Sequence, residues 1–443
     1  MKSSSSAMDG GSIRLVNHAS LLIRSGDSSL LTDPWFSGSI FDEGWSLLHV
    51  NPDDSIAQIA PTSIWISHEH PDHFHPSTLR QVPKSQRAET PIYFRKTKDR
   101  RVRDWCESNG FPVIECEPEE TYYIGKNIEL RVFPVGIVDS AAVIYYDGKT
   151  FLNLNDCNFL NPPDLKRFLR NLNSEIDYVG YLCGYAEGGG SRVDNSFRKR
   201  LMTMQAERFK WLLDALPNSK ILGFAAFKYF SHKENFFQND SISFDFLRDL
   251  VLESPRVIVL KPGDRLETAS KANSLVAIDF WEEKRRVVSP TSKPIVPIDE
   301  DAIVRLARHM NARFRQAAGL LGIAMFRVPK YVGLRPLIFD VVDLEKRLVL
   351  DPRLQAEPHL TDLKEPLLEL NQIRLSSGAL QYSLRDPYGL ATLLINGRFE
   401  ASDSARANLY KWAMVGLVSL SDQRIDLRFV FSNLRKILSS VKN

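Results

Sequence analysis

Four of the nine histidines in this 443-residue chain lie within nine positions, in the stretch SHEHPDHFH of residues 67–75. The apolar run TSIWIS at residues 62–67 leads into them and has the composition of a buried strand, and HPSTLRQV at residues 75–82 begins like a helix. The histidines are therefore expected on a loop at the carboxyl end of a strand, where one loop can direct several side chains at one point.

The spacing inside this cluster suits metal ions, because neutral imidazole and carboxylate are ligands of zinc, iron and manganese. His68 and His70 can chelate one ion, while the adjacent Asp72 and His73 can bind a second ion close by. The alternative is a histidine-rich surface loop without metal, which the complete H-x-H-x-D-H string disfavours. His75 falls outside the string and is expected to begin the helix or to support the ligands.

Charge, cysteines and hydropathy exclude several classes of protein. The 57 Lys and Arg nearly balance the 54 Asp and Glu, so no basic surface predicts nucleic acid binding. The polar N-terminus has no signal-peptide pattern and no later run approaches the ~20 apolar residues of a membrane span, so we expect a cytoplasmic protein. Four cysteines without a CxxC spacing fit a reducing compartment: Cys106, Cys116, Cys157 and Cys183.

Strand-like and helix-like segments alternate from residue 12 onwards, which predicts an α/β domain over residues 12–284. The Pro-rich segment 285–301 is expected to be a linker to a smaller α+β domain at 299–443 with a structural, dimerising or substrate-covering role. In that domain the sequence predicts a helix at 299–320, strands at 334–344 and 391–400, and helices near 406–417 and 427–438.

The string of His68, His70, Asp72 and His73 resembles the metallo-β-lactamase signature, and the hairpin pattern before it resembles the opening of that fold. This resemblance implies an αββα sandwich. In that family a further aspartate bridges the metals from a later strand end, which implies Asp156 in LNLNDCN. A last metal-binding histidine is expected late in the domain, which implies His232 in YFSHKENF.

One histidine of the family pattern is missing. The family usually has a histidine just before the hairpin that leads to Asp156, but this chain has FPVGIVDSAAV there, and Asp139 is the nearest potential ligand. A carboxylate at this position would shift the preference from zinc towards iron or manganese. Alternatively the site holds one metal ion, or Asp139 is only a turn residue.

A closer resemblance lies in residues 17–49 and in ISHEHPDHFHPSTL, LNLNDC and FSHKENFFQND. These blocks resemble the metallo-β-lactamase-like part of CMP-N-acetylneuraminate hydroxylases and the UlaG-like proteins, which implies that His18 and Asp33 support the metal centre. The hydroxylases carry a Rieske cluster, which needs cysteine and histidine ligands at short spacings. No cysteine of this chain has a histidine at such a spacing.

Three functions follow from this sequence. The first is metal-dependent hydrolysis of an ester, amide or phosphodiester bond by a metal-bound hydroxide, with two divalent ions as cofactors and with Asp72 or Asp156 orienting the nucleophile and accepting its proton. The second is a non-haem di-iron oxygenase fed by a separate reductase. The third is a catalytically silent scaffold. For the enzymes we expect a small-molecule substrate, and a homodimer is compatible with the sequence.

Overall fold

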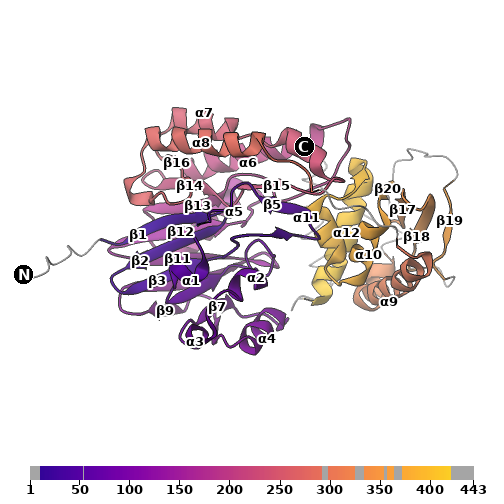
Figure 1. The fold of residues 1–443 in the computed structure, drawn as a ribbon, viewed down its shortest axis with the longest axis horizontal. Coiled ribbons are helices and arrows are strands. Elements are labelled where there is room, and N and C mark those ends of the chain that lie inside the picture. Colours follow the sequence, from indigo (N-terminus) through magenta and orange to yellow (C-terminus); the bar gives the residue numbers. More distant parts are fainter. Residues whose placement is uncertain are drawn as a thin grey trace, which may run out of the picture.

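Two β-sheets packed face to face form the larger part of the protein in the computed structural model, with helices on both outer faces (Figure 1). A smaller group of helices and strands from the C-terminal third lies at one end. The structure describes residues 10–52, 54–291, 298–324, 334–353, 357–363 and 372–420.

The first sheet has six strands in the order β1-β2-β3-β6-β7-β8. Its strands are β1 (Ser12–Asn17), β2 (Ser20–Ser25), β3 (Ser28–Thr32), β6 (Ser63–Ile66), β7 (Ile92–Arg95) and β8 (Val113–Cys116). β1, β2 and β3 pair antiparallel, and β3, β6, β7 and β8 pair parallel. Four short helices follow in this region: α1 (Ile56–Ile59), α2 (Pro76–Leu79), α3 (Lys84–Arg87) and α4 (Arg101–Ser108).

The second sheet has seven strands in the order β16-β14-β13-β12-β11-β10-β9. Its strands are β9 (Thr121–Ile124), β10 (Ile128–Val135), β11 (Asp139–Tyr146), β12 (Lys149–Asn155), β13 (Tyr178–Leu182), β14 (Lys220–Phe224) and β16 (Val257–Val259). The associated helices are α5 (Pro162–Leu172), α6 (Ser196–Ala215), α7 (Asp245–Glu253) and α8 (Lys271–Arg286), with short 3-10 turns at Phe236–Ser241 and Leu266–Thr268.

Side-chain alternation along the strands explains the layers. Successive residues of a strand point to opposite faces, so Leu21 and Ile23 pack between the sheets while Leu22 packs under the outer helices. Leu130 and Ile144, which lie opposite each other on β10 and β11 of the second sheet, join the same inner core. The αββα sandwich expected from the sequence is confirmed.

The first strand is held by a segment far away in the sequence. The amide of Ile13 donates to both carboxylate oxygens of Glu267, at 2.9 and 3.1 Å, across 254 positions. An isolated β-bridge joins Arg14 to Arg265 beside it. The edge of the first sheet is thus closed by residues that precede α8.

A small third sheet brings together the opening loop and the segment that leads to His232. It consists of β4 (Ser39–Ile40), β5 (Trp45–Leu47) and β15 (Lys228–Phe230), in the order β15-β5-β4. The amide of Ser231 donates to the carbonyl of Gly44 at 2.9 Å just beyond this sheet.

The C-terminal part has its own sheet and hydrophobic core. The sheet order is β19-β18-β17-β20-β21, formed by β17 (Leu337–Val341), β18 (Lys346–Leu350), β19 (Leu360–Asp362), β20 (Gln372–Leu375) and β21 (Glu400–Ala401). The helices are α9 (Glu300–Ala324), α10 (Ser377–Arg385), α11 (Gly389–Asn396) and α12 (Asp403–Leu420). The α+β character expected for this part is confirmed, whereas the domain boundary at residue 284 stays a prediction.

One predicted strand of this part is wrong. Residues 391–400 were expected to be extended, but most of them belong to α11, whose Leu390, Leu393 and Leu394 are buried at helical spacing. A short apolar run fits a buried strand and a buried helix equally well. The helix predicted near 427–438 lies outside the described residues. No helix within the described ranges combines the length and apolar character needed to cross a bilayer.

Candidate metal centre

The histidine loop follows β6 and is anchored at its first residue. Ser67 donates from its amide and its hydroxyl to the Asp33 carboxylate, at 2.8 and 2.9 Å. Backbone angles are unusual beside the loop, with positive φ at His18, Asp33 and Asn155, of 42°, 42° and 36°. Residues other than glycine adopt such angles where the surrounding structure enforces them, often at functional sites.

Three predicted ligands converge on one point. His68, His73 and Asp156 each offer a donor atom, and these atoms all lie within 4.8 Å of one another. Nε2 of His73 lies 3.6 Å from Oδ2 of Asp156. All three residues are buried, and nitrogen and oxygen donors at this separation match the needs of a bound divalent ion.

Three further predicted ligands surround this triad. His70 places Nδ1 2.8 Å from Nε2 of His68, and Asp72 places Oδ2 3.4 Å from Nε2 of His73. Asp139 lies 3.9 Å from Nε2 of His68 through Oδ1, in the region where the sequence lacks a histidine.

The seventh predicted ligand, His232, is not joined to the triad. Among the described residues no hydrogen bond or ion pair links it to the other six. Its Nδ1 lies 3.2 Å from Oε2 of Glu234. Burial would raise the pKa of Glu234, but the hydrogen bond with His232 and the charge of Arg398 outweigh burial and lower the pKa to about 2.

Carboxylate partners orient the histidine rings. Nδ1 of His73 lies 3.0 Å from Oδ2 of Asp33, and the other ring nitrogen, Nε2, lies on the side of Asp156. His232 is paired with Glu234 through Nδ1 in the same way. Metal-binding histidines usually donate their second N–H to such a partner, which fixes the tautomer and the ring. The pairs at His73 and His232 therefore fit histidines that bind metal through Nε2.

Asp156 reaches the site through an irregular strand end. The pairing of β12 with β13 shifts register between Asn153 and Asn155. The side-chain amide of Asn155 donates to the carbonyl of Ser140 at 3.0 Å and holds the bend. Such bulges redirect a side chain at the edge of a sheet, and here the bend presents the Asp156 carboxylate to His73.

Several buried polar atoms of the site have no hydrogen-bond partner among the described residues. They are both ring nitrogens of His18, Nε2 of His73, and Oδ1 of Asp72 and of Asp156. Buried polar atoms are nearly always satisfied, and an unsatisfied one costs about 1–3 kcal/mol. A group of them around the same triad fits metal ions that these atoms would bind.

The charges of the site are strongly coupled. Burial opposes the charged form of Asp72, but the nearby His73 charge outweighs it and holds the pKa of this carboxyl well below its usual range. Burial likewise opposes protonation of His73, but Asp72 and Asp33 raise the pKa of its imidazole well above the usual value. Burial and the neighbouring His73 lower the pKa of His68. Because metal ions bind neutral imidazole, a metal ion at His73 would displace a proton, whereas the lowered pKa of His68 favours the neutral form.

The Asp139 carboxyl predicts a pH-dependent affinity for metal. Partial burial and the charge of Asp156 raise its pKa to about 8. If Asp139 is a ligand, its proton must leave on binding, so affinity rises with pH by about tenfold per unit below pH 8 for this group. We expect log Kd to fall less steeply with pH in Asp139→Asn than in wild type, by about one log unit per pH unit below pH 8. Zinc titrations at several pH values measure it, and equal slopes would contradict the role of Asp139.

Two supporting histidines have clear positions. His18 lies on the turn between β1 and β2, with Nε2 3.5 Å from Oδ2 of Asp72, so it lies beside the centre as expected. His75 caps α2, because its ring accepts from the amide of Thr78, which confirms its expected place at the start of the helix.

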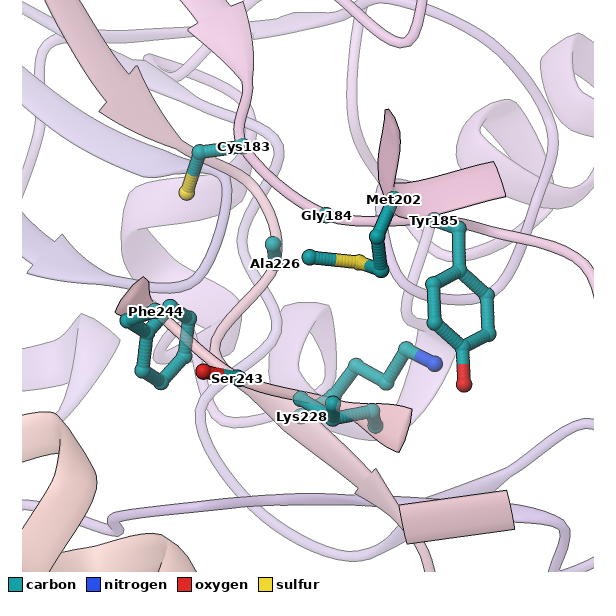
Figure 2. Close-up of a pocket in the computed structure, with 9 residues that line it drawn as sticks. Cys183, Gly184, Tyr185, Met202, Ala226, Lys228, Ser243 and Phe244 are labelled. Carbon is teal, nitrogen blue, oxygen red and sulfur yellow. The ribbon is translucent and has the colours of Figure 1, made fainter. Parts of the chain in front are cut away.

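A buried lysine next to the site was missed by sequence reasoning. Lys228 is 3% exposed, and its ammonium has no hydrogen-bond partner among the described residues. Nζ lies 3.9 Å from the ring centroids of both Trp45 and Phe230. Figure 2 shows the side chain extending towards Tyr185 beside a cavity of about 10 Å³, which is room for one water molecule.

Burial lowers the pKa of Lys228 to about 7, although the charges of Asp72 and Asp156 oppose this shift. The Lys228 ammonium therefore interacts electrostatically with these two carboxylates of the candidate metal centre. Because lysine is rarely buried without a partner, sequence reasoning places a lysine at the surface. Nothing in the neighbouring sequence indicates that Lys228 is buried.

The packed sheets and the buried donors at a strand end define a protein of the metallo-β-lactamase fold with a candidate metal site. Residues 12–159 match the family model of the beta-lactamase superfamily domain. The matched range contains six of the seven predicted ligands and ends before His232.

Curated relatives include hydroxylases. The chain is 27% identical over 221 residues to cytidine monophosphate-N-acetylneuraminic acid hydroxylase of Xenopus laevis, covering 46% of this chain and 37% of the relative. The Cricetulus griseus protein of the same name is 27% identical over 272 residues, covering 56% and 46%. The matches thus span less than half the length of these two relatives.

Solved structures of similar fold bear the names of a hydrolase and a hydroxylase. Isothiocyanate hydrolase from Delia radicum gut bacteria is 14% identical with a TM-score of 0.44, covering 58% of this chain and 99% of that one. CmlA, a diiron beta-hydroxylase from Streptomyces venezuelae, is 14% identical with a TM-score of 0.38, covering 59% and 55%.

Proposed function

We propose that the chain is a metal-dependent hydrolase that cleaves an ester, amide or phosphodiester bond of a small-molecule substrate. The observation that carries this proposal is the buried triad of His68, His73 and Asp156, in which Nε2 of His73 and Oδ1 of Asp156 have no hydrogen-bond partner among the described residues. Divalent metal ions, when bound there, lower the pKa of water and polarise the oxygen of the bond under attack. Hydrolysis requires no electron donor, which makes it the simplest chemistry for these side chains.

The proposed ligands of two ions are the seven residues His68, His70, Asp72, His73, Asp139, Asp156 and His232. Asp33 and Glu234 hold the rings of His73 and His232 through Nδ1.

A second candidate function is a non-haem iron oxygenase that receives electrons from a separate reductase. Asp139 favours it, because a third carboxylate near His68 makes the donor set harder and more suitable for iron. The hydroxylase names of the curated relatives point in the same direction.

Metal content and hydrolysis, measured on the same preparation, test the first proposal. Protein purified without added metal is expected to contain about two divalent ions per chain by elemental mass spectrometry. Hydrolysis of an aryl ester, an anilide or an aryl phosphodiester should stop after chelation and return with zinc or manganese. Iron with reductant-dependent oxygen uptake and no hydrolysis would instead support the oxygenase. Protein without metal, or with metal whose removal changes nothing, would contradict both.

A further inference from the structure

Residues of the C-terminal part contact the loops beside the metal centre. Arg398 follows α11, is 7% exposed, and donates from Nε to Oε2 of Glu234 at 2.7 Å. The same carboxylate oxygen lies 3.2 Å from Nδ1 of His232. Arg398, next to α11, is therefore connected through Glu234 to the ring of His232, the predicted ligand that is not joined to the triad.

The same arginine holds a strained turn. Three successive residues, Phe41, Asp42 and Glu43, have left-handed φ angles of 51°, 55° and 60°. Each such residue costs roughly 1–2 kcal/mol when it is not glycine, so the surrounding contacts must maintain the turn. Arg398 bonds both the carbonyl and the carboxylate of Asp42, and the Asn396 side chain donates to the carbonyl of Phe41 at 3.2 Å.

This turn forms part of the wall of the site. The Phe41 ring lies 5.9 Å from the His70 ring, edge to face. On the His232 side, Asn235 donates to the carbonyls of Gly44 and Asn396, at 2.9 and 2.6 Å. The loop that carries His232 and the turn that packs on His70 are thus fastened to the same two residues of the C-terminal part.

We propose that the C-terminal part completes the metal centre, with Arg398 as a positioning residue that fixes the Glu234 carboxylate, and through it His232, for metal binding. This inference rests on the proposed ligand role of His232. Outer-shell partners of metal-binding histidines typically contribute 10–100-fold to metal affinity, and a partner supplied by a distant segment has the same physical effect as a local one.

Cobalt binding to the full-length chain tests this proposal, because the visible spectrum of Co²⁺ reports ligand geometry. Arg398→Gln is expected to weaken Co²⁺ binding by about 10–100-fold and to change the spectrum, and Glu234→Gln should do the same. Arg398→Lys, which keeps a positive charge near Glu234, should restore part of the affinity.

Arg406→Gln is the matched control. Arg406 is also a buried arginine of the C-terminal part, 9% exposed, but it pairs with Glu187 and bonds the carbonyl of Gly188. The Arg406→Gln variant should lose similar contacts between the C-terminal part and the rest of the chain, yet bind Co²⁺ with wild-type affinity and spectrum. Equal behaviour of Arg398→Gln and Arg406→Gln would overturn the proposal.

A further variant separates this inference from its premise. If His232→Ala alters Co²⁺ affinity and spectrum while Arg398→Gln does not, His232 is a ligand and the positioning role of Arg398 is wrong. If His232→Ala changes neither, the ligand role of His232 fails and the positioning role fails with it. The triad of His68, His73 and Asp156 is then tested separately by its own variants.

Discussion

Replacing His68 and His73 together by glutamine is expected to lower metal affinity by more than about 100-fold, because losing even an outer-shell partner costs 10–100-fold. Both imidazoles belong to the triad whose donor atoms lie within 4.8 Å of one another. Glutamine is preferred to alanine because it keeps a polar group beside Asp33 and Asp72, whose buried carboxylates would otherwise lose a partner. Elemental mass spectrometry and a zinc competition titration measure the loss, and circular dichroism checks the fold.

His75→Gln is the control for this double variant. His75 belongs to the same loop but caps α2, so its replacement should leave metal content unchanged and reduce the free energy of unfolding by about 1 kcal/mol. If the double variant retained the wild-type metal content, the triad would not be the metal site.

Replacing Lys228 by methionine is expected to stabilise the metal-free protein at pH 6. The ammonium is buried and has no hydrogen-bond partner in the described part of the chain, and burial lowers its pKa to about 7. Below pH 7 both folded and unfolded chains hold the proton, so the folded chain bears the full burial penalty. Between pH 7 and the usual lysine value the folded chain has lost the proton and the unfolded chain has not, so stability rises with pH. The upper limit of the gain is about 5 kcal/mol at pH 6.

Urea unfolding of chelator-treated protein at pH 6 and pH 9 measures this effect. Lys228→Met should be more stable than wild type at pH 6, and the difference should shrink by pH 9. Lys210→Met, at an exposed position of α6, should match wild type at both values. A loss of stability in Lys228→Met at pH 6 would show that the ammonium has a favourable partner and would contradict this account.

The sandwich and the triad were accessible from the sequence because their signals are local. The run before Ser67 is apolar and the histidines follow at fixed spacings, and Asp156 lies at the strand end where the resemblance to the metallo-β-lactamase family implies a ligand. The short apolar run at residues 391–400 lacked such a signal, and only packing of its leucines selects a helix.

Two other features of the site depend on tertiary structure alone. Glu234 receives Arg398 from 164 positions further along the chain, and nothing in the sequence around either residue indicates this pair. Lys228 lies at the start of β15, and its burial depends on how Trp45 and Phe230 enclose its side chain. Sequence periodicity predicts which face of an element is buried, but it does not reveal a partner brought in from another part of the chain.

The bond between Ile13 and Glu267 has a consequence for biosynthesis. At typical translation rates of about 5–20 residues per second, the ribosome needs roughly 10–50 s after making Ile13 to produce its partner 254 positions later. During that time β1, with Ile13 and Leu15 destined for the core, lacks the segment that closes its edge. Unpaired apolar strands are prone to aggregate. Chaperone-assisted synthesis should therefore increase the yield of folded protein.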